Sequence, residues 1–409
     1  MADVMWIGAA QATPEVDTIV IGSHTAAQTF QAIINGKTVT YIAQASDTTN
    51  AILAASFAAL LAACTEPEFQ ELTFVASSAN VLVTGPSDGA PFTLTVGGTG
   101  TISTSTTTAP VSPSDIGNGA NYSTGALPGA ASRLVLQEGS VPMKYNAGAL
   151  TNAITFARYA SYTGSVGLPD VNPAGYREYR QTHLDINATA SYCQQTSGDQ
   201  AGQFRLNCTS ASAHTATVVG DGTSNIPQVG SEVLELTGTI AASVINSTNG
   251  SITVAPNAGQ TAVITTVRGI NSTITLGVGC TLNSGSTPTI SLTNCNVAIN
   301  TTYTTISMNN GQTTTYGAAA GTTTTVDGGV LVWKSTGSFG TLEIGGGGTF
   351  DMSSAPASVA AGGTIKVNAG GSLFDPAGRI TAGYAVQLYR CDVPEVSLQL
   401  GPGRTLTVN

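Results

Sequence analysis

The sequence predicts a mainly β protein with a small N-terminal α+β domain followed by a single-chain β-solenoid (β-helix). Three observations predict this fold class. Only 9% of the 409 residues are charged whereas 41% are hydrophobic, so the polar surface must consist largely of Thr, Ser, Asn and Gly. Thr favours strands because its branched Cβ fits a pleated surface, and the 48 Gly supply tight turns. A short apolar pattern also recurs along the C-terminal part of the chain.

Residues 1–97 are predicted to form an α+β docking domain. Asn35-Gly36 suits the positive φ angles of a tight hairpin, and Asp47 or Thr48 is expected to cap a helix that ends before Pro67. The helix is expected over residues 50–64 and the strands over residues 18–21, 29–34, 38–42, 71–75, 81–83 and 92–96. This order predicts one amphipathic helix packed on one antiparallel sheet.

The composition changes after this domain. Residues 98–120 are rich in Thr, Gly, Ser and Pro and are predicted to be a linker. Residues 121–409 are predicted to form the solenoid, with an insertion near residues 166–190 and a C-terminal cap from about residue 376.

An apolar-x-apolar pair of residues repeats through the predicted solenoid. The pairs are Leu234/Leu236, Ile252/Val254, Ile274/Leu276, Ile290/Leu292, Ile306/Met308, Leu342/Ile344 and Ile365/Val367, with a weaker copy at Thr325-Val326. From Ile274 onward the steps are 16, 16, 20, 16 and 23 residues. One rung of short strands with tight corners uses roughly 16 to 23 residues, and stacked rungs bury the apolar row. An up-and-down barrel, a sandwich or a segmented trimeric fibre are the alternatives.

The six cysteines form no C-x-x-C pair and no zinc-binding spacing. Cys193 and Cys208, like Cys280 and Cys295, are 15 residues apart, close to one rung. Buried stacked thiols are expected in a protein made in a cytoplasm, and a disulfide between adjacent rungs is the alternative in oxidising surroundings.

Net charge and hydropathy disfavour several classes of partner. The net charge is −10 with no Lys/Arg cluster, which disfavours nucleic acid and anionic membranes. No signal peptide is evident at the start, and the longest apolar stretch, residues 51–64, is too short to span a bilayer. We therefore expect synthesis in a cytoplasm, followed by export, if any, inside an assembled particle.

Candidate catalytic groups are sparse. His24, His183 and His214 lie in unrelated surroundings, and no phosphate-binding loop or nucleophile elbow is present. Glu343 and Asp351 are the carboxylates most suited to meet on one rung, but solvated outward side chains explain them as well. No catalytic residue, metal or cofactor is predicted, so the protein is expected not to be an enzyme.

One stretch concentrates unusual side chains in a charge-poor chain. Residues 175–186 hold two Tyr, two Arg, a Glu, a His and an Asp. Tyr and Arg are enriched at binding hot spots, so the candidate interaction surface comprises Tyr176, Arg177, Tyr179, Arg180 and His183. The alternative is an insertion that packs against the side of the solenoid and pairs its own charges.

Several segments resemble known families. Residues 121–129, Asn-Tyr-Ser-Thr-Gly-Ala-Leu-Pro-Gly, resemble the N-[W/Y]-S-x-G-x-x-P motif that opens many bacterial β-helices, autotransporter-like passengers included. Residues 30–37, 67–72 and 91–95 resemble small domains of tailed-phage virion proteins. Residues 1–8, 166–169 and 176–186 are similar to uncharacterised phage or prophage proteins, planctomycete ones included. The resemblance offers no catalytic residues to carry over.

This resemblance implies a non-enzymatic structural virion protein, a capsid decoration or a tail-associated scaffold or spike. Its expected partners are other virion proteins, with homo-oligomers in the particle, and its expected location is the virion. The alternatives are a glycan-binding or glycan-cleaving tailspike that contacts a host surface glycan, or a bacterial surface adhesin.

Overall fold

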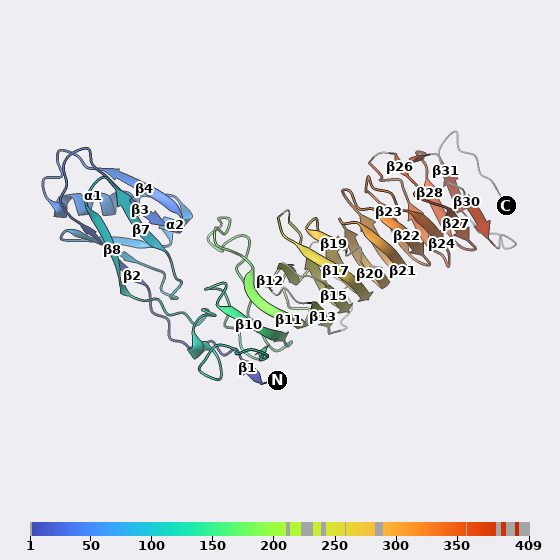
Figure 1. Ribbon diagram of the computed structural model, residues 1–409, viewed down its shortest axis with the longest axis horizontal. Coiled ribbons are helices and arrows are strands. Elements are labelled where there is room, and N and C mark those ends of the chain that lie inside the picture. The colour runs from blue at the N-terminus through green and yellow to red at the C-terminus, as the bar shows by residue number, and fades with distance from the viewer. Residues whose placement is uncertain are drawn as a thin grey trace.

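The computed structural model describes residues 2–209, 213–221, 232–238, 243–257, 259–282, 289–356, 358–381, 386–389 and 397–400. The protein is mainly β. Figure 1 shows a small part that holds both α-helices and a longer body of strands that extends towards the C-terminus. We call the small part the N-terminal module (residues 13–111) and the longer body the barrel.

The N-terminal module contains two antiparallel sheets and a helix. Its elements are β2 (Val16–Ile21), β3 (Thr29–Ile34), β4 (Lys37–Ile42), α1 (Asn50–Ala62), α2 (Pro67–Gln70), β5 (Thr73–Ser77), β6 (Asn80–Thr84), β7 (Leu94–Gly98) and β8 (Ile102–Thr108). The sheet orders are β5-β6-β2-β8 and β4-β3-β7, so the prediction of a single sheet is wrong. Strand β8 lies within residues 98–120, the predicted linker; the predicted domain boundaries themselves stay a prediction.

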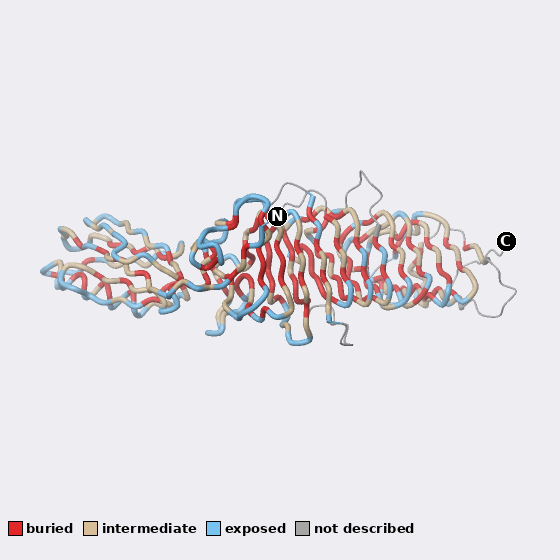
Figure 2. Tube along the Cα trace, turned by 90° about the horizontal axis from the view of Figure 1, so that it is seen from below, coloured by how far each residue is buried: buried red, intermediate tan, exposed pale blue. Residues whose placement is uncertain are grey.

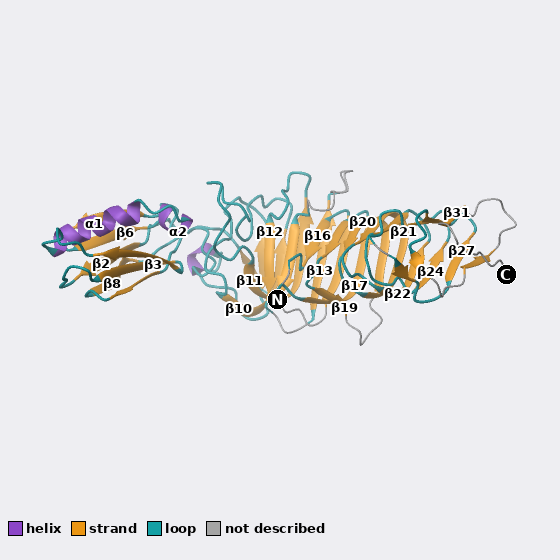
Figure 3. Cartoon of the chain, turned by 90° about the horizontal axis from the view of Figure 1, so that it is seen from above, coloured by secondary structure: helices purple, strands orange, loops and turns teal. Residues whose placement is uncertain are grey.

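Helix α1 forms where it was predicted and supplies the core of the module. The Thr49 side chain caps it by accepting a hydrogen bond from the Ile52 amide, so the cap is one residue later than expected. Leu53, Phe57 and Leu61 are fully buried against the sheets because they fall on one face of the helix. Figure 3 shows α1 and α2 along one side of the module.

The barrel consists of parallel strands from both ends of the sequence. Its elements are β1 (Asp3–Met5), β9 (Arg133–Leu136), β10 (Leu150–Arg158), β11 (Leu184–Gln195), β12 (Phe204–Cys208), β13 (His214–Gly220), β14 (Leu234–Gly238), β15 (Ser243–Thr248), β16 (Ser251–Val254), β17 (Ala262–Ile270), β18 (Thr273–Leu276), β19 (Cys280–Leu282), β20 (Thr289–Ile299), β21 (Tyr303–Thr315), β22 (Gly321–Val326), β23 (Val330–Trp333), β24 (Thr341–Ile344), β25 (Thr349–Asp351), β27 (Ile365–Asn368), β28 (Ser372–Asp375), β30 (Val386–Tyr389) and β31 (Ser397–Leu400). Strands β26 (Val359–Ala360) and β29 (Ile380–Thr381) form a separate pair. A 3-10 turn, η1, covers Gly119–Asn121.

Most of the barrel strands pair in two parallel ladders, whereas β19 pairs with the first residues of β17. One ladder contains the row Val267, Ile290, Ile306, Thr324, Leu342 and Ile365, in register at chain offsets of 16 to 23 residues. The other contains the row Leu234, Ile252, Ile274 and Val297. The repeated apolar pairs are therefore stacked and buried, but Ile274 and Ile290 belong to different ladders. The sequence spacing alone placed them in one row.

The predicted fold class, a small α+β domain followed by a single-chain β-solenoid, is wrong. Hydrogen bonding links the strands into a closed parallel barrel with additional paired strands. Long strands join the ladders: β11 pairs with β12 and β13, β20 with β17 and β18, and β21 with β22 and β23. Asn294 in β20 and Asn310 in β21 have φ angles of 51° and 71°, so these strands bend without ending. The expected corners thus lie inside continuous strands, which the sequence pattern did not reveal.

The apolar interior runs the length of the barrel, as the buried residues in Figure 2 show. Trp333, Phe339 and Phe350 pack together in it, with ring centroids 5.0 to 5.8 Å apart. The five cysteines that the structure describes are free thiols, and burial raises the pKa of Cys193, Cys208 and Cys280 to about 12. Cys391 and the last part of the predicted C-terminal cap, including residues 401–409, lie outside the described residues.

Two chain segments connect the module to the barrel, and one buried side chain ties them together. Strand β1 pairs with β9, so residues 3–5 belong to the barrel although residues 1–97 were predicted to form the docking domain. The chain then passes through residues 6–12 to the module and returns to the barrel through residues 112–122. Asn121 is fully buried, donates to the carbonyls of Ser112 and Asp115, and accepts from the Ala10 amide at 2.9 Å.

Candidate functional site

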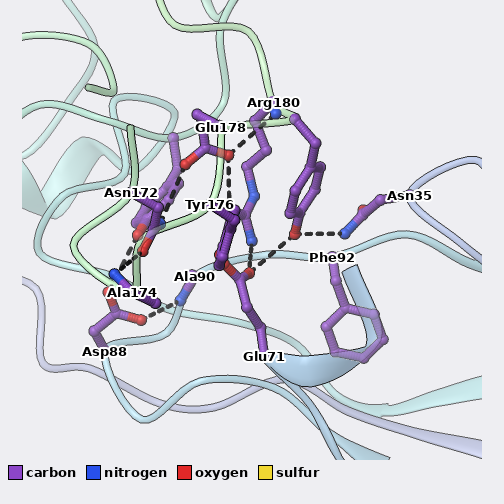
Figure 4. Close-up of polar contacts among 12 residues, drawn as sticks. Asn35, Glu71, Asp88, Ala90, Phe92, Asn172, Ala174, Tyr176, Glu178 and Arg180 are labelled. Atoms are coloured by element: carbon purple, nitrogen blue, oxygen red, sulfur yellow. Dashed lines mark hydrogen bonds and ion pairs between the residues drawn. The ribbon is translucent and has the colours of Figure 1, made fainter. Parts of the chain in front are cut away.

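The stretch singled out in the sequence forms a loop that reaches the N-terminal module (Figure 4). We call residues 167–183 the docking loop; β11 follows it at Leu184. Backbone hydrogen bonds close it at its base, from the Leu168 amide to the Thr182 carbonyl, and at its tip, from the Asn172 amide to the Tyr176 carbonyl, both 2.8 Å. Gly175 turns the tip with a φ of 91°, a conformation that favours glycine.

Glu71 of the module is the centre of the contact. It follows α2, and both of its carboxylate oxygens accept hydrogen bonds from the docking loop. The Tyr179 hydroxyl donates to Oε2 at 2.9 Å, the Tyr176 hydroxyl donates to Oε1, and Arg180 donates to both oxygens. We call Glu71, Tyr176, Tyr179 and Arg180 the Glu71 clasp. It is a charge-assisted contact of a type that is stronger than neutral hydrogen bonds.

Aromatic and polar neighbours orient the clasp. The rings of Tyr176 and Tyr179 stack with centroids 6.3 Å apart, and the Arg180 guanidinium carbon lies 4.5 Å from the Tyr179 ring centroid. Glu178, buried on the loop, lies 3.3 Å from Arg180 Nη1 and accepts from the Arg180 amide at 3.1 Å. The amide group of Asn35 donates to the Tyr179 hydroxyl at 3.2 Å, which adds a second residue of the module.

The clasp keeps its ionised form. Burial alone would raise the pKa of Glu71, but hydrogen bonds from Arg180 and Tyr176 outweigh it and hold that pKa below its ordinary value. Burial would lower the pKa of Arg180, yet the bond to Glu71 raises it. Burial, reinforced for Tyr176 by its bond to Glu71, raises the pKa of both tyrosines, so they donate as neutral phenols.

A second, smaller contact lies beside the clasp. The Tyr145 hydroxyl donates to Asp88 of the module at 3.1 Å, and Asp88 also accepts from the Ala90 amide at 3.0 Å. Ala90, Tyr145 and Leu168 form a small buried apolar cluster between module and barrel. The module is therefore held by polar and apolar contacts together.

Charged side chains fix the base of the docking loop to the barrel. Arg205 on β12 lies opposite Glu235 on β14 in register, and its Nε donates to Glu235 Oε2 at 3.0 Å. Arg205 also donates to the Leu168 carbonyl at 2.8 Å, while His183 Nε2 lies 3.4 Å from Glu235. Burial would raise the pKa of Glu235, but His183 and Arg205 lower it.

The five predicted interaction residues thus have different environments. Tyr176, Tyr179 and Arg180 converge on Glu71, His183 lies at Glu235, and Arg177 is exposed. Their role as a surface for another molecule stays a prediction. The sequence did not reveal Glu71 as a partner, because it lies more than 100 positions before Tyr176 and Tyr179 and stands in no motif.

The groups considered for catalysis have hydrogen-bond partners within the protein. Glu343 on β24 accepts a hydrogen bond from Asn368 at 3.1 Å. Asp351 stands on a different strand, β25, and accepts from the backbone amide of Ser353. His214 bonds to Ser191 and the Ala188 carbonyl, and burial lowers its pKa. Among the described residues, no group of three or more His, Cys, Asp or Glu is placed to hold a metal ion.

Fold and contacts define a two-part β protein in which an antiparallel module is clasped to a parallel barrel. No family model matches the chain, and no curated protein matches it. Within the part of the chain that the structure describes, no helix is long and apolar enough to cross a membrane.

Proposed function

We propose that this chain is a non-enzymatic structural protein of a tailed-phage or prophage particle. In this proposal the N-terminal module attaches to other virion proteins and the barrel projects from it, as a capsid decoration or a tail-associated spike. The observation that carries the proposal is the Glu71 clasp, which couples two differently built parts into one body. Such coupling serves a protein that must present one part at a defined angle to the other.

The construction of the barrel supports a mechanical role. Its strands satisfy one another's backbone groups along two parallel ladders, and its interior is continuously apolar. Outward positions such as Thr305, Thr323 and Thr341 form an in-register row of small hydroxyl side chains. A surface with few charged side chains suits a long-lived extracellular particle.

The placement of the ionisable groups supports the non-enzymatic part of the proposal. Arg158 and Asp199 form an ion pair that is nearly inaccessible to solvent and joins two segments of the barrel, and the Arg205–Glu235 pair anchors the docking loop. Structural ion pairs of this kind explain charged groups in the barrel without a substrate.

Immunogold electron microscopy tests the proposal. Particles purified from the producing cells would be labelled with antibodies against the full chain, and mass spectrometry would quantify the protein in the same fraction. We expect gold at one regular position on the particles. A protein found only in the particle-free soluble fraction would contradict the proposal.

A further inference from the structure

A groove of about 570 Å³ lies on the barrel next to the docking loop. Residues 180–183 form one wall, Asn207, Thr209 and Thr237 lie on the barrel, and residues 259–261 form the opposite wall. We propose that this groove binds a neutral saccharide. The inference goes beyond the proposed structural role and does not depend on which particle carries the protein.

The groove is built from strands in register and from fixed side chains. Asp185, Asn207 and Thr237 occupy one outward row across β11, β12 and β14. The Asn207 side-chain amide donates to Asp185 Oδ1 at 2.6 Å, and the Gln181 amide donates to the same oxygen. These bonds orient the two carboxamides before any ligand arrives, which lowers the entropic cost of binding.

The opposite wall is fixed in a similar way. The Gln260 side-chain oxygen accepts from the Asn257 amide at 2.9 Å, which leaves the Gln260 amino group as a donor. The Thr261 hydroxyl donates to the Gly238 carbonyl at 3.3 Å, so its oxygen still accepts. Gly238 and Gly259 line the groove without side chains and keep it open.

The chemistry of the walls selects the ligand class. The volume lies in the usual range for small-ligand sites, roughly 300 to 1,000 Å³. Seven of the eleven lining residues carry a side-chain amide or hydroxyl, which matches a ligand with many hydroxyl groups that donate and accept. An apolar ligand finds no large aliphatic or aromatic side chain among the lining residues.

An anionic ligand fits less well than a neutral one. The two cationic or titratable groups of the lining already face carboxylates: Arg180 pairs with Glu71, and His183 lies at Glu235. The Asp185 carboxylate borders the same row as Asn207. Because the cationic or titratable groups already face carboxylates, phosphates and uronic acids gain little attraction in the groove, and the uncharged saccharide remains as the class that the groove fits.

Binding measurements on the full chain test the proposal. Saturation-transfer NMR and calorimetry would use short neutral oligosaccharides of glucose, galactose, rhamnose and N-acetylhexosamines as probes, beside a uronic-acid oligosaccharide and inorganic phosphate. We expect saturable binding of at least one neutral probe. The double variant N207A/Q260A should bind that probe at least about tenfold more weakly, because two oriented amides are removed.

A steric variant locates the site. Thr209→Trp places a large ring at an exposed position of the groove and should abolish binding, whereas Thr293→Trp, at an exposed position of β20, should leave it unchanged. Circular dichroism would show that both variants fold. Absence of binding by every neutral probe, tighter binding of the acidic probes, or wild-type affinity in Thr209→Trp would overturn the proposal.

Discussion

The N-terminal module and the barrel satisfy their backbone groups in different ways. The module pairs neighbouring strands through short antiparallel connections, as in the β3–β4 hairpin at Asn35-Gly36. The barrel pairs each strand with another 16 residues or more away, in parallel register. A local defect in the module therefore affects one hairpin, whereas a defect in the barrel is passed to the strands on either side.

The largest expected effect is loss of a core ring from the barrel. Phe350→Ala removes one of three mutually packed rings and should lower the free energy of unfolding by about 3 to 5 kcal/mol. Urea denaturation followed by circular dichroism measures it. Val75→Ala in the module, at a side chain that is 57% exposed, is the control and should change little. Equal effects of the two substitutions would contradict the contrast between the regions.

Asn121→Ala tests the junction between the two regions. The substitution removes the side chain that bonds two backbone carbonyls and one backbone amide in the buried junction. It should lower the free energy of unfolding by about 2 to 4 kcal/mol. The same denaturation measurement applies. Asn118→Ala removes a hydrogen bond at an exposed turn and should lower the free energy of unfolding clearly less. A larger loss for Asn118→Ala than for Asn121→Ala would show that Asn121 does not stabilise the junction.

Glu71→Gln is expected to loosen the clasp. Arg180 loses a charged partner, so the contact between module and barrel should weaken by about 1.5 to 3 kcal/mol. Small-angle scattering should then report a changed distribution of distances, and trypsin should cut at Arg180. Glu66→Gln, at a carboxylate that is 50% exposed and pairs with Lys37, is the matched control and should leave both measurements unchanged.

The clasp should also respond to pH. The pKa of Glu71 is lower in the folded protein than the ordinary value of 4.5, so its stabilising contribution is complete above that value. The contribution is lost as the pH falls through the lowered pKa. The difference in unfolding free energy between the wild type and Glu71→Gln should shrink as the pH is lowered from 7 towards 3. A difference that stays constant over this range would exclude an ionised clasp.

The smallest expected effect concerns a bend in a barrel strand. Asn310 has a φ of 71°. Asn310→Ala should therefore lower the free energy of unfolding by about 1 kcal/mol, whereas Asn310→Gly should leave it nearly unchanged. Thermal unfolding of both variants gives the comparison. If glycine destabilises as much as alanine, the side chain of Asn310 rather than its backbone conformation holds the bend.

Local features of the fold could be predicted from sequence, and the long-range closure could not. Helix α1, the hairpin at Asn35-Gly36 and the burial of the apolar pairs follow from capping, turn chemistry and periodicity. Closure of the barrel depends on β11, β20 and β21 continuing through their bends, and the positive φ of Asn294 leaves no mark in the hydrophobic pattern.

Only part of the candidate site could be predicted from the sequence. Tyr176, Tyr179 and Arg180 stand out because Tyr and Arg cluster in a chain with 9% charged residues. Glu71 does not stand out, since a single acid after a short helix is common. The groove depends on Asn207, Thr237 and Gln260, which are ordinary polar residues until strand register brings them together.

The pairing of β1 with β9 determines how the module can be separated from the barrel. Residues 3–5 lie in the barrel and the chain then passes through the module and returns, so the module is tethered twice, through residues 6–12 and through residues 112–122. A protease that cuts either tether leaves the other intact. The module therefore stays attached after one cleavage, and its release requires two.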